Sequence, residues 1–456
     1  MLTYELKKMP GVPLYEALYR CIRADILSGK LAPNQKLPSK RSLCTNLKVS
    51  KITVEGAYNQ LLSEGYICSR EKVGYFVEAV ERAEHAPKLC QPAPELPKDT
   101  AVDLTGNGPA HFPFSVWSRL QRQVMLDLGE QLLLPLHSQG LPELRQAIAG
   151  HLAEFRGMNV DPENIVIGAG TDFLYNLLIQ LLGQDKLYAV EEPGYGKIRK
   201  IYAAGGACCI GVPLDSQGVR TDCLQRAQVL HISPSHHFPT GLVTPLSRRQ
   251  TLLCWARENA DRWIIEDDYD SEFRFASHPL PTMQSLDPQG QVIYMNTFSK
   301  TLAPSIRISY MVLPPVLMRQ FRTRLGFYSC TVSSFEQYTL ARFLRQGHFE
   351  KHINRMRKFY KLRRNRVLSA IESCPLASRL TILEENAGLH FLVKVDTALS
   401  DEALVDRLLQ AGIRIRALSS YYLSPVPEEK AHCLIVNYSG LTDAQLEQLE
   451  EKLSAL

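Results

Sequence analysis

A lysine and an arginine stand in the stretch from Asn296 to Tyr310, which reads Asn-Thr-Phe-Ser-Lys-Thr-Leu-Ala-Pro-Ser-Ile-Arg-Ile-Ser-Tyr. The apolar run that follows the arginine, 308–313, predicts a buried strand. A lysine whose pKa is lowered by burial can form a Schiff base with a carbonyl compound. An arginine can grip a phosphate through its planar fork of donors. Unless they are polar residues of an ordinary surface loop, Lys300 and Arg307 predict a site for an aldehyde that carries a phosphate, such as pyridoxal phosphate.

An acidic and an aromatic side chain, Asp267 and Tyr269, follow a short apolar run that ends at Ile265. A carboxylate at the end of a buried strand can pair with a protonated pyridine nitrogen, which keeps the ring electron-withdrawing. The tyrosine can hydrogen-bond the hydroxyl group of the same ring. The alternative is a helix cap after a strand. Because Lys300 comes only 33 residues after Asp267, we read the three side chains together as parts of one site.

Three other motifs follow predicted strands. Gly168–Thr171 reads Gly-Ala-Gly-Thr and opens a helical pattern, so its backbone N–H groups and the helix dipole could hold a phosphate. Glu192–Tyr195 places an aromatic ring where it could stack on a flat ligand, although packing is the alternative. Ser233–Gly241 contains two histidines without carboxylate or cysteine companions at ligand spacing, so we predict no metal site.

Apolar runs that are typical of buried strands alternate with helical patterns from residue 101 onward. This alternation predicts an α/β domain with a mostly parallel sheet, whose ligands bind at loops beyond the carboxyl ends of the strands. The motifs above stand at such ends. The predicted strands are 164–167, 186–190, 229–232, 263–266, 292–295 and 308–313, and the predicted helices include 171–182 and 246–259.

The composition is that of a soluble globular protein with two or three domains, since the chain has 456 residues, 45% of them apolar and 22% charged. No apolar run is long enough to span a membrane, and the first residues lack the apolar core of a signal peptide. The 11 cysteines are scattered without CxxC pairs, which is typical of reduced thiols. We therefore expect a cytoplasmic protein with no membrane partner.

The basic excess of the chain is confined to its first 80 residues. They hold 12 Lys and Arg against 7 Asp and Glu, a net charge of +5, so the remaining residues sum to zero. Helical spacing is present over 11–28 and 40–47, a third helix begins after Ser50 and stops at Gly65, and two β-rich pieces follow at 66–69 and 75–80. This pattern predicts a winged helix-turn-helix that binds DNA, rather than a merely solvated basic face.

Residues 81–100 contain four prolines and no periodicity, which is typical of a semi-rigid linker. The chain therefore divides into a DNA-binding domain over 1–80, a linker over 81–100 and an α/β domain over 101–456. We expect the small C-terminal subdomain of the α/β domain to begin at about residue 331.

The first domain resembles the GntR family of bacterial regulators. It departs from that family at three positions, Asn34, Cys44 and Lys51, where glycine, alanine and arginine are usual. None of these departures breaks the fold, although Lys51 gives up the bidentate fork of a guanidinium. The resemblance rests on segments that occur in the family's order: Ile26–Gly29, Leu37–Leu43, Val49–Val54, Glu64–Tyr66 and Gly74–Val77.

The GntR resemblance also implies which residues meet DNA. Arg41 belongs to the second helix, and Ser50, Lys51 and Thr53 belong to the start of the third helix. Gly74 would let the tip of the wing approach the DNA backbone closely, because glycine has no side chain to hold it away. The implied partner is a double-stranded operator.

The second domain resembles the fold-type I pyridoxal-phosphate aminotransferases over about residues 101–456. The motifs that carry the resemblance come in the family's order: Gly168–Thr171, Pro193–Tyr195, Pro239–Gly241, Asp267–Tyr269 and Thr297–Arg307. The resemblance implies that Lys300 is the catalytic lysine that binds the cofactor, that Asp267 faces the ring nitrogen and that Tyr195 stacks on the ring. The other implied cofactor residues are Tyr269 at the ring hydroxyl and Gly170, Thr171, Thr297 and Arg307 at the phosphate.

The second domain departs from this family where a substrate carboxylate would bind. Phe238 stands in place of an asparagine, and Leu434–Tyr438 lacks the arginine of the family's Arg-Leu-x-Phe pattern. The run Ser305–Ser309 also differs from the usual Gly-Leu-Arg-Ile-Gly. Arg414 and Arg416 lie nearby in the sequence, without a role that the sequence assigns. We therefore expect no physiological turnover of ordinary α-amino acids, while a residual aminotransferase half-reaction stays open.

The union of the two domains resembles the MocR and GabR type of regulator over the full length. It implies a transcriptional regulator that binds its operator as a head-to-tail homodimer. The expected effector is pyridoxal phosphate itself or an amine whose acid group is not at the α-position, since an α-carboxylate would lack its usual bidentate partner. The alternative is an aminotransferase that turns over an amino substrate. A GntR sensor without cofactor would leave Lys300, Asp267 and Arg307 unexplained.

Overall fold

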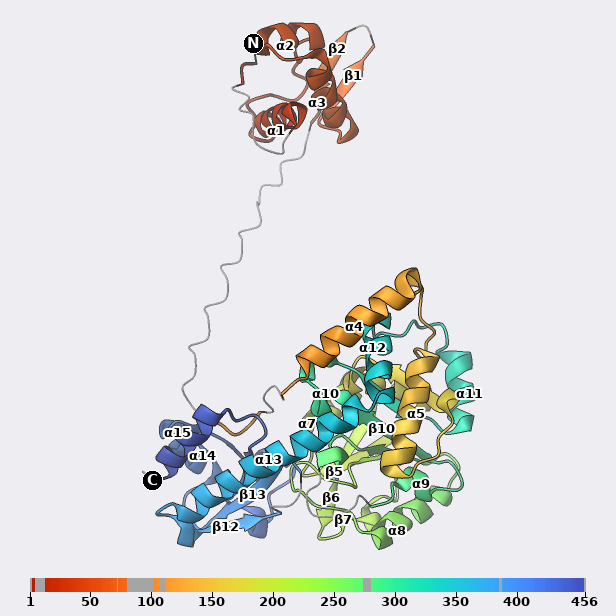
Figure 1. The fold of residues 1–456 in the computed structure, drawn as a ribbon, viewed down its shortest axis with the longest axis vertical. Helices are drawn as coiled ribbons and strands as arrows, with labels where there is room; N and C mark the ends of the chain where they lie inside the picture. The colour runs from red at the N-terminus through yellow and green to blue at the C-terminus, as the bar shows by residue number, and fades with distance from the viewer. Residues whose placement is uncertain are drawn as a thin grey trace. The chain divides into compact units, whose positions relative to one another are not determined.

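The computed structural model describes residues 2–4, 13–71, 73–79, 102–106, 111–273, 280–384 and 388–454. The chain forms two compact units, Met1–Lys98 and Asp99–Leu456 (Figure 1). The linker predicted over 81–100 lies outside the described residues. Within the described part, the structure has no helix that is both long and apolar enough to cross a membrane.

The described residues of the first unit form three helices and a β-hairpin. Its elements are α1 (Leu14–Leu27), α2 (Lys40–Leu47), α3 (Lys51–Ser63), β1 (Ile67–Arg70) and β2 (Gly74–Val77). Helices α1 and α3 bury apolar stripes that include Leu18, Ile22, Val54 and Tyr58, so the core forms between two amphipathic helices. This is the predicted winged helix-turn-helix, with strand pairing that ends at Val77.

The second unit is organised around an eight-stranded sheet in the order β4-β11-β10-β9-β8-β5-β6-β7. Strands β10, β9, β8, β5 and β6 are parallel, whereas β11 is antiparallel to both of its neighbours. Every predicted strand is present, which confirms the predicted α/β class. The bounds are β4 (Ile165–Gly168), β5 (Leu187–Glu192), β6 (Cys208–Asp215), β7 (Gly218–Val219), β8 (Val229–Ile232), β9 (Trp263–Asp267), β10 (Val292–Thr297) and β11 (Ser309–Val312).

Helices cover both faces of this sheet. Ile265 and Ile293 pack against helices α6 and α11, whereas their neighbours Ile264 and Val292 pack against α8. Burial of successive residues on opposite faces explains why the strands read as continuous apolar runs. The helices of the second unit are α4 (Phe114–Leu128), α5 (Pro142–Arg156), α6 (Thr171–Leu182), α7 (Gly196–Ala204), α8 (Leu246–Arg257), α9 (Met283–Leu286), α10 (Phe298–Thr301), α11 (Pro315–Arg324), α12 (Ser334–Arg345), α13 (His348–Ser373), α14 (Asp401–Gln410) and α15 (Asp443–Ser454).

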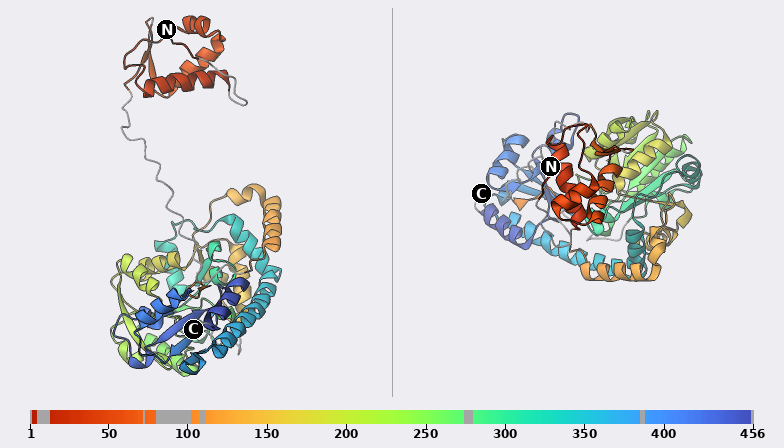
Figure 2. Two further views of the ribbon diagram at one scale, coloured as in Figure 1. Left: turned by 90° about the vertical axis from the view of Figure 1, so that its left-hand side faces the viewer. Right: turned by 90° about the horizontal axis from the view of Figure 1, so that it is seen from above.

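A second, smaller sheet lies in the C-terminal part of this unit. Its order is β12-β13-β16-β15 and all its pairs are antiparallel. The long helix α13 runs from the large sheet towards it, and the right-hand view of Figure 2 separates the blue C-terminal elements from the green elements of the large sheet. The strands are β12 (Leu380–Leu383), β13 (His390–Val395), β15 (Arg416–Ala417) and β16 (Cys433–Asn437), with a separate parallel pair, β3 (Val102–Asp103) and β14 (Ile413–Arg414).

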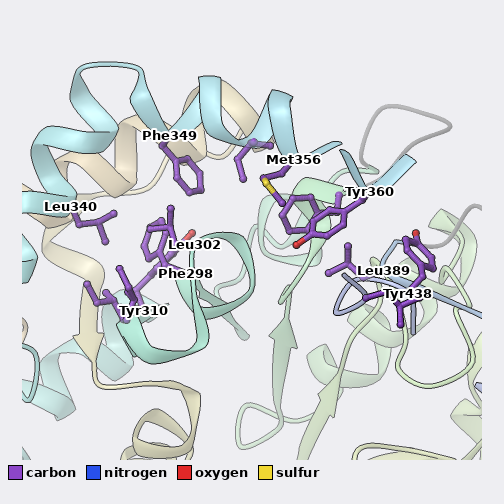
Figure 3. Packing of buried hydrophobic residues seen from close by; sticks show 14 of the residues in the cluster. Phe298, Leu302, Tyr310, Leu340, Phe349, Met356, Tyr360, Leu389 and Tyr438 are labelled. Carbon is purple, nitrogen blue, oxygen red and sulfur yellow. The ribbon is translucent and has the colours of Figure 1, made fainter. Parts of the chain in front are cut away.

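One hydrophobic core joins the large sheet to the smaller one through α13. The rings of Phe298 and Phe349 meet edge to face with their centroids 5.5 Å apart. Phe298 begins the short helix α10, which carries Lys300, and Leu302 directly follows that helix. The core therefore anchors the backbone on both sides of the lysine. Figure 3 shows Phe298, Leu302, Tyr310, Leu340, Phe349, Met356, Tyr360, Leu389 and Tyr438 in this cluster.

Candidate functional site

The predicted cofactor residues meet around one cavity of about 560 Å³ in the second unit. Its walls come from segments that follow β4, β5, β8, β9 and β10, together with residues of the smaller sheet. These five strands run in one direction, so their carboxyl ends meet at one edge of the sheet, where such folds bind ligands. Gly170 lies against the Arg307 guanidinium. The other predicted residues line the cavity: Thr171, Tyr195, Asp267, Tyr269, Thr297, Lys300 and Arg307.

Lys300 has the environment that its predicted chemistry requires. Burial lowers the pKa of its ammonium group, and the nearby carboxylates of Asp270 and Asp267 act in the opposite direction. A lower pKa increases the fraction of neutral amine, which is the form that attacks a carbonyl. The lysine therefore combines a fixed backbone with a reactive side chain.

One carboxylate oxygen of Asp267 has no hydrogen-bond partner among the described residues. Its Oδ2 accepts a hydrogen bond from the Tyr175 hydroxyl at 2.5 Å and lies 3.6 Å from His231 Nε2. Its Oδ1 is buried and has no hydrogen-bond partner among the described residues. A buried carboxylate oxygen is costly unless a donor reaches it. A protonated pyridine nitrogen is such a donor, so this residue fits pyridoxal phosphate.

The turn at Gly168–Thr171 forms one wall of the cavity together with Arg307. Gly170 has a φ of 90°, which L-residues with a side chain rarely adopt, and a Cβ at this position would also displace the Arg307 guanidinium, so glycine is favoured there. Arg307 Nη2 and Lys197 Nζ lie 3.2 Å and 2.6 Å from the same oxygen of Asp172. Two cations share one carboxylate at the start of helix α6, which leaves positive charge for a phosphate.

Ser299 adds a hydroxyl that the sequence did not single out. The Thr297 hydroxyl accepts hydrogen bonds from Ser309 Oγ at 2.8 Å and from the Ser299 backbone at 3.1 Å. The Ser299 hydroxyl lines the cavity, is buried and has no hydrogen-bond partner in the described part of the chain. The Ser299 hydroxyl is therefore available to hydrogen-bond a phosphate oxygen, and the Thr297 hydroxyl fixes the Ser299 backbone.

Two aromatic residues complete the cofactor wall. Tyr195 is 50% exposed and meets Phe238 edge to face, with ring centroids 6.0 Å apart. Burial raises the pKa of Tyr269, so its hydroxyl keeps its proton, and this oxygen lies 3.4 Å from His236 Nδ1. From these positions Tyr195 can stack on a ring in the cavity, and the Tyr269 hydroxyl can hydrogen-bond it.

Buried pairs of histidine and carboxylate lie beside the cavity. His236 Nδ1 is 2.7 Å from Asp270 Oδ2, and His237 Nε2 is 3.6 Å from Glu191 Oε2. Burial raises the pKa of Glu191 to about 8 and lowers that of His237 to about 3, so both are largely neutral at pH 7. Sequence reasoning found no carboxylate near these histidines because the fold brings the partners from distant strands. No cluster of three or more possible metal ligands occurs among the described residues.

The opposite wall of the cavity comes from the smaller sheet and the segment that follows β15. Arg416 stands directly opposite Ile435 in the β15–β16 pair. Arg414, by contrast, lies 3.8 Å from Asp103 and is not part of the cavity lining. The structure thus separates the two arginines that the sequence left unassigned. The residues of this wall are Leu389, His390, Arg416, Tyr421, Leu423 and Asn437.

Glu192 fastens this wall to the large sheet. Its Oε1 accepts hydrogen bonds from Leu423 N at 3.0 Å, Ser424 N at 2.7 Å and Ser424 Oγ at 2.6 Å. Burial alone would raise the pKa of Glu192, but these hydrogen bonds and the charge of Arg199 outweigh it and lower the pKa. We call the contact of Glu192 with Leu423 and Ser424 the Glu192 latch.

The residues predicted to meet DNA lie in the first unit on α2, α3 and the hairpin. Arg41 and Lys51 are exposed, and the Arg41 guanidinium has no partner among the described residues. Lys51 Nζ lies 3.8 Å from Glu55 Oε1. Ser50 is the N-cap of α3, since its hydroxyl accepts from Thr53 N at 3.2 Å. The side chains of Arg41 and Lys51 are thus exposed to solvent on the consecutive helices α2 and α3.

Gly74 begins the second strand of the hairpin with a φ of 127°. A side chain at this position would be strained, because L-residues rarely adopt such a φ. A Cβ would also come within 3.3 Å of Lys36 Cε. The glycine therefore serves the hairpin geometry and keeps the tip of the wing free of bulk.

Two family models match this chain: bacterial regulatory proteins of the gntR family over residues 14–77, and aminotransferase class I and II over residues 100–453. The probable rhizopine catabolism regulatory protein MocR of Rhizobium meliloti is 34% identical, over 96% of this chain and 92% of its own length. The chain belongs to the MocR-type regulators of the GntR family. Another relative of this MocR-type regulator is the pyridoxine biosynthesis transcriptional regulator PdxR of Corynebacterium glutamicum, 33% identical over 88% of this chain and 87% of its own length.

The second unit of this MocR-type regulator has the fold-type I architecture. The crystal structure of a multiple substrate aminotransferase from Thermococcus profundus is similar to this unit, with a TM-score of 0.68 and 23% identity. The match spans 80% of this chain and 95% of the aminotransferase. This likeness shows the fold, and together with the family match it confirms the predicted architecture. The chain is accordingly a transcriptional regulator with a GntR-type DNA-binding head, the first unit, and an aminotransferase-like unit whose family implies pyridoxal phosphate.

Proposed function

We propose that this MocR-type regulator binds pyridoxal phosphate at Lys300 and senses a small molecule through the same pocket. The observation that carries the proposal is the buried Oδ1 of Asp267, which has no hydrogen-bond partner among the described residues, in a carboxylate that lines the same cavity as Lys300. When bound, pyridoxal phosphate supplies a ring nitrogen that suits this oxygen and a carbonyl group that reacts with primary amines.

Each residue around the cofactor has a task that follows from its place. Asp267 keeps the ring nitrogen protonated, and the Tyr175 hydroxyl holds that carboxylate in position. Tyr195 would stack on the ring, Tyr269 would hydrogen-bond the ring hydroxyl, and Lys300 would supply the amine. Gly170, Thr171, Ser299 and Arg307 would hold the phosphate, with Thr297 supporting the backbone of α10.

Turnover as an aminotransferase is the second candidate function. It is favoured by Lys300 and Asp267, which together provide what a pyridoxal-phosphate enzyme needs for amine chemistry. It is opposed by the apolar residues Ile435 and Phe238, since neither can hold the α-carboxylate of an amino acid. We therefore place sensing first.

The effector is pyridoxal phosphate itself or an amine whose acid group is not at the α-position. A ligand shifts a regulator only if it makes different contacts in its two states. With the cofactor bound, an effector amine would compete with the Lys300 amine for its carbonyl group, and a Lys300 amine set free would change the charges within the pocket. Filling of an empty pocket by the cofactor is the other route, and the name of the relative PdxR, a pyridoxine biosynthesis regulator, supports it.

We further propose that the regulator acts as a homodimer on a paired operator, with each head reaching over the partner subunit. The basic excess of the first 80 residues favours contact with DNA through this segment. Light scattering of the full chain at low micromolar concentration should report a dimer. Monomer alone under these conditions would contradict this part of the proposal.

One experiment separates sensing from turnover. The purified full chain, loaded with pyridoxal phosphate, is mixed with a panel of amines and α-amino acids, and the visible spectrum, the oxo product and operator affinity are measured together. A stoichiometric spectral change and a shift in operator affinity, without accumulating product, support sensing. Product that accumulates over many turnovers would assign the chain to the aminotransferases instead.

A further inference from the structure

We propose that Arg416 recognises an acidic group of the effector, so that the effector is a primary amine with a separate carboxylate or comparable anion. The proposal rests on the proposed function, because it takes the amine of the effector to react where Lys300 stands. It goes beyond that function in naming the residue that selects the ligand and the chemical class that this residue selects.

The cavity has cationic side chains on two different walls. Arg307 and Lys197 belong to the wall at the start of α6, where they share the Asp172 carboxylate. Arg416 belongs to the smaller sheet, is exposed and has no hydrogen-bond or ion-pair partner within the described chain. Arg199 of α7 also lines the cavity, where its charge acts on Glu192. A cofactor with a single phosphate would be held at the first wall and would leave Arg416 without an anion.

Strand pairing determines where the Arg416 side chain goes. Strands β15 and β16 are antiparallel, and Arg416 is directly opposite Ile435, so both side chains lie on the same face of the sheet. Asn437 comes two residues after Ile435, which places it on this face as well, and it lines the cavity. The Arg416 side chain therefore leaves β15 on the face that carries Ile435 and Asn437, and Arg416 and Asn437 both line the cavity.

Aromatic residues line the same cavity as Arg416, which suits a short hydrocarbon chain between an amine and an acid. Phe238 lies between Tyr421 and His390, with ring centroids 5.3 Å and 5.1 Å away. Burial lowers the pKa of His390 well below its usual value, so this histidine is neutral and does not compete for an anion. Arg416 is the cation on this wall that can bind a carboxylate bidentately.

The test compares matched amines with and without an acid group. The full chain, loaded with pyridoxal phosphate, is titrated with β-alanine, γ-aminobutyrate and δ-aminovalerate, and in parallel with propylamine, butylamine and pentylamine. Visible absorbance reports binding, and operator affinity is a second readout. The variants are Arg416→Gln, Arg416→Lys and the control Arg414→Gln, which removes the same charge two residues away but outside the cavity.

We expect Arg416→Gln to weaken the best acid-bearing amine about 10- to 100-fold, the range for loss of a charge-assisted hydrogen-bonded pair. The alkylamines should bind this variant as they bind the unmodified chain, Arg416→Lys should recover part of the loss, and Arg414→Gln should have no effect. An unchanged visible spectrum of each loaded variant confirms that it is folded.

Two results would overturn the inference. If Arg416→Gln binds the acid-bearing amines as well as the unmodified chain does, or loses both sets of amines equally, Arg416 does not read the acid group, although the proposed function stands. If no amine of either set changes the spectrum of the unmodified chain, the amine-sensing function itself fails, and the inference fails with it.

Discussion

The head and the aminotransferase-like unit arrange their functional side chains in opposite ways. In the head, Arg41 and Lys51 are exposed on consecutive helices, where solvent-accessible positive charge attracts a polyanion. In the second unit, Asp267 is buried and Lys300 has its pKa lowered by burial, and partners from distant segments surround them. A DNA-binding surface needs accessible charge, whereas a cofactor pocket needs groups that water does not reach. The two functions should therefore respond to separate sets of substitutions.

The substitution Lys300→Ala should have the largest effect, and it should affect the second unit alone. Visible absorption from the lysine-bound cofactor should disappear completely, because no amine remains at this position. Operator affinity of the effector-free protein should stay within about twofold, since Lys300 and the DNA-binding residues belong to separate compact units and changes at independent sites are expected to add. Absorbance spectra and fluorescence anisotropy with operator DNA measure the two properties. A variant that keeps the visible band would show that the cofactor lysine was assigned wrongly.

The reciprocal change is Arg41→Ala in the head. Operator binding should weaken by about 1–3 kcal/mol if this guanidinium reads a base edge. Lys30→Ala is the matched control, because Lys30 is also exposed in the head but lies 3.3 Å from Asp25, outside α2 and α3. Both variants should keep the visible spectrum of the loaded protein. Loss of spectrum together with DNA binding would mean that the chain had unfolded.

Glu191→Gln tests how a buried carboxyl group of the second unit makes the free energy of unfolding depend on pH. With a folded pKa of about 8, Glu191 keeps a proton that the unfolded chain has already lost above about pH 5. The unfolded state then binds fewer protons, so the free energy of unfolding falls as pH rises towards 8. Between about pH 6 and pH 8 the loss should be roughly 2 kcal/mol. The glutamine can still accept the hydrogen bond from Ser233 N, so this pH dependence should vanish.

Tryptophan fluorescence reads this effect in one unit only, because Trp117, Trp255 and Trp263 all belong to the second unit. Denaturant titrations of the cofactor-free chain at several pH values give the slope. Glu447→Gln, at an exposed position of α15, is the control and should keep the slope of the unmodified protein. An unaltered slope in Glu191→Gln would show that another group causes it.

The smallest expected effect belongs to Ser50→Ala, which removes the N-cap of α3. The helix should lose about 1 kcal/mol of stability, as is typical when a capping hydroxyl is deleted. Amide exchange in α3 reports this change, which tryptophan fluorescence would not detect. The visible absorbance spectrum of the protein loaded with pyridoxal phosphate should be unaffected. Faster exchange in the second unit as well would show that the two units do not behave independently.

The sequence predicted the head and the cofactor side of the pocket because their signals are local. The periodicity of α1 and α3 lies within single helices, Asp267 is the last residue of β9, and Lys300 comes three residues after the end of β10. Tyr175 was not predicted, since inside the apolar helix α6 it resembles any core residue. Likewise, nothing in the chain alone shows that Asp270 meets His236.

Arg416 illustrates the limit of local signals most clearly. Its place at the cavity depends on the register between β15 and β16, a pairing between segments that are separated along the chain. A shift of one residue in this register would turn the side chain to the other face of the sheet. Only the assembled sheet therefore distinguishes Arg416 from Arg414.

The Glu192 latch has a consequence for the speed of the regulator. Three donors share a single acceptor oxygen, so the attachment of the loop at Leu423 and Ser424 depends on one atom of Glu192. We infer that release of this contact opens the pocket wall and limits how fast an effector leaves. Stopped-flow release of a bound amine should be faster in Glu192→Gln, and an unchanged rate would contradict this. The lifetime of the signal, and not only its strength, would then be set by one carboxylate.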